Sequence, residues 1–270
     1  HPEHDGVQLA IAEVALLVGD PARAKSVLEG FAEGNAAYER ALLLRSQADL
    51  DLGDLDAALA TLERGEALYP GQIQFRVKRI ETLVSEQDFQ SALELAQRTG
   101  GRDALAGPAR AWFARTEARL LNSLGRSEEA LALLETITAA NPADAEAWGG
   151  RVSILIEAGR ADEARDALKQ VLSERPQAGA LYALLASTEL ARGDVAAAES
   201  AMRERVGRTA DATAVLELAD YLHGVGRSQE GAELLAEAAD EVGGAQSLEI
   251  RYLRVAMLLS AGDAAAAQRE

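Results

Sequence analysis

A repeat of 34 residues is the feature of this sequence that most limits its fold. Gly125 and Gly159 lie 34 residues apart, and each follows one apolar run and precedes another. Each glycine is followed five residues later by an alanine and seventeen residues later by a proline. A period in the low thirties that is built from two helical runs is typical of stacked helical hairpins.

The same turn recurs along the whole chain, at sites that we call the turn positions. Seven of the eight are glycine, as expected where a helix ends in the left-handed region that only a residue without Cβ reaches freely. A residue able to cap the next helix follows nearly all of them, as at Asp54 and Asp194. The turn positions are Gly19, Gly53, Gln87, Gly125, Gly159, Gly193, Gly226 and Gly262.

Small side chains stand at fixed distances from the turn positions. Alanine lies five residues after seven of the eight, and Gly231 replaces it after the other one. Such a residue is needed where two helices approach too closely for a longer side chain. The second run of each pair also carries an apolar stripe at i, i+3, i+4, i+7 and i+8, as in residues 164–172. Because one hairpin cannot bury this stripe alone, we expect each hairpin to pack on the next.

The composition of the 270 residues excludes several classes of partner and site. A formal net charge of −17 argues against a nucleic acid or an anionic membrane surface as the main partner. The lack of cysteine excludes disulfides, thiolate metal sites and cysteine nucleophiles. No run approaches the roughly 20 apolar residues of a membrane span, so we expect no direct membrane insertion by this segment. No signal peptide is recognised, and we expect the chain to be part of a longer protein.

Residues that could carry catalysis are few. The histidines are His1, His4 and His223, and their spacing does not form the helical HExxH pair of a metalloprotease. The glycines at 100 and 101 lack the context of a phosphate-binding loop. The paired acids lie in the expected first turns of helices, where carboxylates stabilise the positive end of the helix dipole. We therefore predict no catalytic residue, no metal site and no cofactor.

These residues resemble the tetratricopeptide repeat family. The resemblance rests on an aromatic residue near the start of the first helix (Trp148, Tyr182), the turn glycine, the alanine five residues later and the closing proline (Pro142, Pro176). It covers nearly the whole chain, in about eight units of which the last is cut short. It implies an all-α, right-handed superhelical solenoid of antiparallel helix pairs.

One interval between turn positions is longer than the rest. Gln87 and Gly125 are 38 residues apart, and the segment between them holds glycines and a proline that cannot all lie inside one helix. We expect three repeat units in residues 1–99, an extended link in residues 100–108, and units four to eight in residues 109–270, together forming one continuous solenoid. The link is either a tolerated surface insertion or a hinge between two blocks.

The resemblance implies that the first helices line a concave groove that binds the ligand. Trp112, Arg115 and Arg119 are three to four residues apart and so share one helix face. Aromatic residues and arginine are enriched at binding hot spots. The alternative is that Trp112 packs beside Phe113 and that the arginines pair with neighbouring acids. The predicted groove residues are Arg40, Gln47, Gln74, Trp112, Arg115, Arg119 and Asn122.

These implications favour a non-catalytic scaffold that binds a peptide, a helix or a partner protein. The usage of alanine, arginine and glycine is typical of bacteria. The resemblance implies a place in envelope or exopolysaccharide-export assembly, in the periplasm or at the outer membrane rather than in the cytoplasm. Two alternatives stay open: a structural spacer or self-assembling module, and the recognition arm of a larger enzyme whose catalytic domain lies outside this chain.

Overall fold

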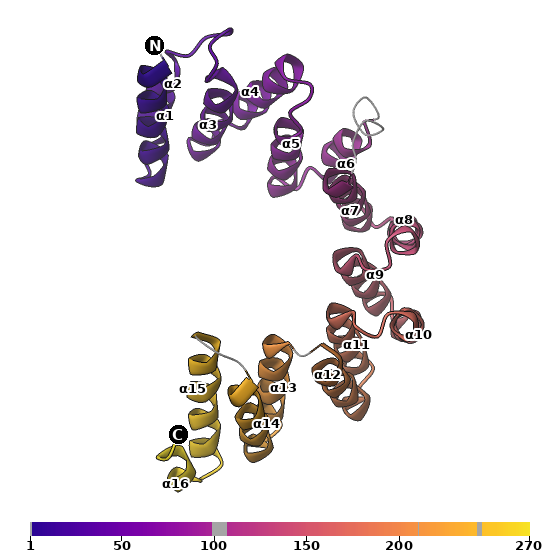
Figure 1. Ribbon diagram of the computed structural model, residues 1–270. Coiled ribbons are helices and arrows are strands. Elements are labelled where there is room, and N and C mark those ends of the chain that lie inside the picture. Colours follow the sequence, from indigo (N-terminus) through magenta and orange to yellow (C-terminus); the bar gives the residue numbers. More distant parts are fainter. Residues whose placement is uncertain (1, 99–106, 210, 242–244) are drawn as a thin grey trace. The chain divides into compact units, whose positions relative to one another are not determined.

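A computed structural model describes residues 2–98, 107–209, 211–241 and 245–270, and within them it shows helices joined by turns and no strand (Figure 1). The chain divides into two compact units, His1–Ser127 and Glu128–Glu270. Antiparallel helix pairs build both units, which confirms the predicted all-α class.

The helices of the first unit begin with the pairs α1/α2, α3/α4 and α5/α6, and α7 follows them. Their bounds are α1 (Pro2–Leu17), α2 (Pro21–Leu28), α3 (Tyr38–Asp51), α4 (Leu55–Leu68), α5 (Gln74–Ser85), α6 (Phe89–Gln97) and α7 (Gly107–Ser123). The predicted link at residues 100–108 lies mostly outside the described residues and stays a prediction, as does the continuity of the solenoid. Its last two residues, Gly107 and Pro108, are the first residues of α7.

The second unit continues the alternation of first and second helices. Its elements are α8 (Ser127–Ala140), α9 (Ala145–Glu157), α10 (Ala161–Glu174), α11 (Gly179–Ala191), α12 (Val195–Thr209), α13 (Ala212–Gly224), α14 (Ser228–Glu241), α15 (Ala245–Ser260) and α16 (Ala264–Ala267).

The predicted turns are confirmed at all eight turn positions. Each has a positive φ, from 61° at Gln87 to 83° at Gly262. Gln87 is the one residue other than glycine with a positive φ in the part of the chain that the structure describes. A side chain with a Cβ is strained in this region, which explains why glycine fills the other seven positions.

Aspartate caps the second helices, as predicted. The side chains of Asp20, Asp54, Asp88, Asp194 and Asp263 each accept a hydrogen bond from the backbone N–H three residues later, at 2.9–3.1 Å. Each bond satisfies one of the N–H groups that the first turn of a helix leaves without a partner. These caps therefore fix the residue at which each of these helices begins.

The small residues five positions after the turns are buried where the helices meet. Six of them are at most 1% exposed: Ala24, Ala58, Ala92, Ala130, Ala164 and Ala198. The stripe that follows is buried as well, with Leu168, Val171 and Leu172 in α10 all inside. The close approach inferred from the sequence is thus confirmed.

Contacts between helices stay local along the chain. In the first unit α1 packs on α2 and α3, and in the second α9 packs on α10 and α11. Apolar side chains consequently form a core that is spread along the repeats, with one cluster around Leu42 and Phe75 and another around Leu235 and Ile250. Each helix pair is buried by its neighbours, as expected for a repeat array.

Candidate functional site

The predicted groove residues all lie on first helices of the first unit. Arg40 and Gln47 belong to α3, and Gln74 is the first residue of α5. The other four lie on α7, at three- and four-residue intervals that place them on one face: Trp112, Arg115, Arg119 and Asn122.

Polar side chains bridge successive first helices in this unit. The Arg40 guanidinium forms an ion pair with Glu13 of α1, and the Gln74 amide donates a hydrogen bond to Glu39 of α3. Through these bonds α1 contacts α3 and α3 contacts α5, although the bonded residues lie far apart in the sequence. They also show that Arg40 pairs with an acid of its own chain, which is the alternative that the sequence left open.

The α7 face combines an aromatic ring with an exposed cation. Trp112 is half-buried and packs edge-on against Phe113, with ring centroids 4.9 Å apart and planes at 85°. Asn122 Oδ1 accepts a hydrogen bond of 2.7 Å from Ser127 Oγ, and Arg115 also has an interaction partner. The Arg119 side chain is exposed, and no bond of its guanidinium is seen among the described residues. Arg119 is therefore the cation on this face that a ligand can reach.

Sequence reasoning missed a second kind of surface, a groove between successive second helices with a first helix as its floor. In the first unit one such groove, of about 680 Å³, lies between α4 and α6 over α5. Within this groove the carboxylate of Glu66 forms ion pairs with Arg76 at 2.6 Å and with Arg79 at 2.7 Å. The sequence could have indicated these residues, because Glu66 stands at a fixed distance from the turn position Gly53, and Arg76 and Arg79 at fixed distances from Gln87.

The Glu66 ion pairs predict how the stability of the first unit depends on pH. Burial, the largest single influence, raises the pKa of Glu66, but the hydrogen bonds and charges of Arg76 and Arg79 outweigh it and hold the pKa below its usual value. This stabilisation is present above the pKa of the unfolded chain, roughly 4.3, and is lost as the pH falls through the lower folded pKa. Glu66→Gln is expected to cost about 1–2 kcal/mol at neutral pH, after allowance for partial exposure.

Urea unfolding of the two proteins from pH 7 down to pH 3 checks this expectation. The difference in free energy between wild type and variant should shrink as the pH falls. The control is Glu86→Gln, at an exposed carboxylate that ends α5. A difference that is constant with pH would show that Glu66 acts through packing and not through its charge.

The equivalent place in the second unit is also bridged by side chains of the chain itself. It lies between α8 and α10, where Arg151 sits over the ring of Trp148 at 5.2 Å from its centroid. The same guanidinium donates a hydrogen bond of 3.4 Å to Glu135. Counted from the turn positions, Arg151 and Glu135 correspond to Arg79 and Glu63 of the first unit.

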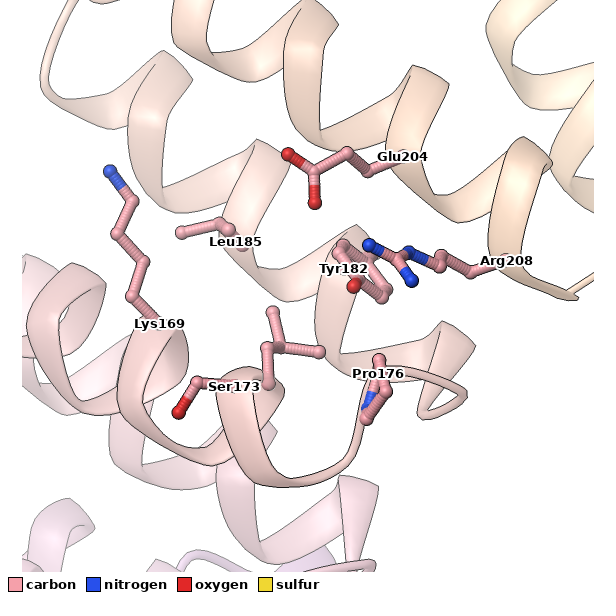
Figure 2. Close-up of a pocket in the computed structure, with 8 residues that line it drawn as sticks. Lys169, Ser173, Pro176, Tyr182, Leu185, Glu204 and Arg208 are labelled. Carbon is pink, nitrogen blue, oxygen red and sulfur yellow. The ribbon is translucent and has the colours of Figure 1, made fainter.

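A further groove lies between α10 and α12, over α11 (Figure 2). It has a volume of about 470 Å³ and an apolar floor of Leu172, Tyr182 and Leu185. Figure 2 shows Lys169 on the α10 side and Arg208 on the α12 side. The full lining is Lys169, Leu172, Ser173, Pro176, Tyr182, Leu185, Glu204 and Arg208.

Two other kinds of site are absent from the described residues. Among them, no helix combines the length and the apolar character that crossing a membrane requires. Within the same residues, no group of three or more histidine, aspartate or glutamate side chains is arranged to hold a metal ion. His223, one of the three histidines, forms a 2.8 Å hydrogen bond between its Nδ1 and Ser228 Oγ at the turn before α14.

Comparison with known proteins places these features in a family. Family profiles described as tetratricopeptide repeat match residues 115–179 and 155–220. Residues 115–220 of this chain are tetratricopeptide repeats. The resemblance seen in the sequence is thereby confirmed for these residues.

One solved structure supports the tetratricopeptide fold, and two others show a weaker likeness. A tetratricopeptide repeat protein from Parabacteroides merdae is 16% identical and matches with a TM-score of 0.51, over 95% of this chain and 99% of that one. A Podospora anserina putative kinesin light chain is 19% identical over 64% of this chain and 95% of that one, with a TM-score of 0.49. TTC0263 from Thermus thermophilus is 21% identical over 68% and 98%, with a TM-score of 0.42. A comparison with curated proteins finds no match.

The family supports a coarse statement of function. Tetratricopeptide repeats form protein-interaction scaffolds that bind protein or peptide partners, and their fold is generally non-catalytic. The seven predicted groove residues are not tested by these comparisons and stay a prediction.

Proposed function

We propose that this protein binds a peptide, a helix or a partner protein along the first-helix face of its first unit, centred on α7. The observation that carries the proposal is the exposed Arg119, two helical turns after the half-buried ring of Trp112. Because arginine and tryptophan are enriched in binding hot spots, this pair is the best anchor on the face.

The bonded residues on α3 and α5 support the α7 anchor. Arg40 and Gln74 are held by Glu13 and Glu39, so their side chains lose less conformational entropy when a ligand arrives. Gln47 is held in the same way, by a 2.8 Å hydrogen bond to Asp51. These residues can therefore provide a polar surface of fixed geometry on α3 and α5 of the same unit.

The substitution Arg119→Glu tests this function. Peptides selected from a random displayed library against the wild-type protein are expected to bind the variant at least about tenfold more weakly, which is about 1.4 kcal/mol. The loss follows from charge reversal at the accessible cation. Fluorescence polarisation with the selected peptides measures it.

Arg175→Glu is the matched control for this test. Arg175 is an exposed arginine that ends α10, outside the proposed face, and its replacement changes the net charge by the same amount. Peptide affinity should be unchanged in this variant. Equal affinity of the Arg119→Glu variant and the wild type would show that the α7 face is not the binding surface.

A second candidate function, self-association, is favoured by exposed apolar side chains on α1 and α15. On α1 these include Val14 and Leu17, the latter 85% exposed, and on α15 they include Leu248 and Tyr252, the latter 75% exposed. Large exposed apolar patches mark interaction sites, and two different patches on one chain allow copies to join head to tail. Light scattering should then give a mass above 28.5 kDa that rises with concentration. Val14→Glu should keep the protein monomeric, and a constant monomer mass for the wild type would eliminate this candidate.

The cellular role that we propose is a scaffold of the bacterial envelope, in exopolysaccharide export or a related assembly. Composition and family resemblance support this placement. Fractionation of the source cells, followed by immunoblotting, tests it: we expect the protein in periplasmic or outer-membrane fractions, and recovery in the cytoplasmic fraction alone would contradict the proposal.

A further inference from the structure

Three equivalent places between successive second helices differ in the side chains that cross them. Between α4 and α6 and between α8 and α10, an arginine stands eight residues before the turn position, as Arg79 and Arg151, and pairs with an acid of the preceding second helix. In the α10–α12 groove the corresponding residues are Leu185 and Lys169. Among the described residues, no ion pair therefore joins these two positions, and the floor position is apolar.

The charged groups around the α10–α12 groove are asymmetric. Lys169 Nζ lies 3.1 Å from Oε1 of the buried Glu189, but the lysine side chain remains 54% exposed. On the opposite wall the exposed Arg208 has no hydrogen bond or ion pair among the described residues. Glu204 is the acid in the lining, and Figure 2 shows it one helical turn from Arg208. The free charge that a ligand meets at the Pro176 end is the Arg208 guanidinium.

We propose that the α10–α12 groove is a second docking site, for a peptide segment of a partner in which an acidic residue adjoins a large apolar residue. The apolar side chain would cover Leu172, Leu185 and the ring of Tyr182, and the carboxylate would pair with Arg208. The groove volume of about 470 Å³ falls within the range of ligand pockets, about 300–1,000 Å³. Charge-assisted pairing with arginine would give the site its preference for acidic segments.

This site is separate from the α7 face in the proposed function. Its residues all belong to the second unit, whereas the α7 face belongs to the first. A failure of the Arg119→Glu experiment therefore leaves this proposal standing, and the reverse also holds.

Methyl-labelled full-length protein and two synthetic peptides test the proposal. Both peptides are capped at their ends and carry a central phenylalanine, which is flanked by glutamates in one and by lysines in the other. The acidic peptide is expected to shift the methyl signals of Leu172 and Leu185 in a saturable manner. The basic peptide should bind at least about tenfold more weakly. Equal binding of the two peptides, or no saturable shift with the acidic one, would overturn the proposal.

Two variants locate the binding. Leu185→Arg installs the arginine of the equivalent places and should abolish the shift at Leu172. Arg208→Glu changes only an exposed side chain and should weaken the acidic peptide at least about fivefold. Arg269→Glu, at an exposed arginine outside the groove lining, is the control that leaves binding unchanged. Binding that survives both variants would contradict the site. Shifts of the groove methyls with protein concentration alone would mean that a second copy occupies it, which also overturns the proposal.

Discussion

Replacing Ala198 with leucine is expected to lower the free energy of unfolding by about 2–3 kcal/mol, because a well-packed core does not accept extra methyl groups without strain. Ala198 stands five residues after the turn position Gly193 and is fully buried where α12 packs on α11. The same position is alanine in most repeat units. Urea unfolding followed by far-ultraviolet circular dichroism measures the loss.

Ala196→Leu is the matched control, since Ala196 is exposed on the same helix two residues earlier. Surface substitutions of this kind usually change stability by less than about 0.5 kcal/mol. If both substitutions destabilise the protein equally, the loss comes from placing leucine in α12 and not from a close approach of α11 and α12.

Replacing Gly65 with alanine is expected to cost about 2 kcal/mol, although alanine by itself favours a helix interior by about 1 kcal/mol over glycine. A Cβ added at Gly65 of α4 would lie 2.2 Å from Cε1 and 2.3 Å from Cδ1 of Phe75. The Phe75 ring is fully buried and stacks on Tyr69, with centroids 6.1 Å apart, so it has little room to move. The same urea measurement applies.

A double-mutant cycle with Phe75→Leu separates steric conflict from other causes. In the Phe75→Leu background the alanine should cost at least about 1 kcal/mol less, as expected for residues in direct contact. Gly207→Ala is the control, because an added Cβ there meets nothing within 4 Å, and it should stabilise α12 by up to about 1 kcal/mol. Additive effects of Gly65→Ala and Phe75→Leu would show that the ring does not limit this position.

The features that the sequence predicted correctly are those decided within one hairpin. The positive φ at Gly159, the cap at Asp54 and the burial of Ala164 each follow from rules that act over a few residues. Because the same turn occurs eight times along the chain, one irregular unit does not hide the repeat. The fold class could therefore be inferred with no knowledge of tertiary contacts.

Contacts between hairpins were not predictable in the same way. The closeness of Gly65 to Phe75 and the pairing of Arg40 with Glu13 depend on the packing geometry of helices from adjacent hairpins. For the candidate site, spacing alone placed Trp112 and Arg119 on one face of α7. It could not distinguish a paired arginine from an accessible one, since the partner can lie on another helix.

Among the described residues of each unit, the main packing contacts join helices one or two places apart along the chain, and this has a consequence for how the protein tolerates change. A lesion in one hairpin loosens that hairpin and those beside it, while more remote hairpins keep their geometry. Surfaces on separated hairpins are then free to diversify one at a time. A single chain of this design can acquire a new partner without giving up an old one.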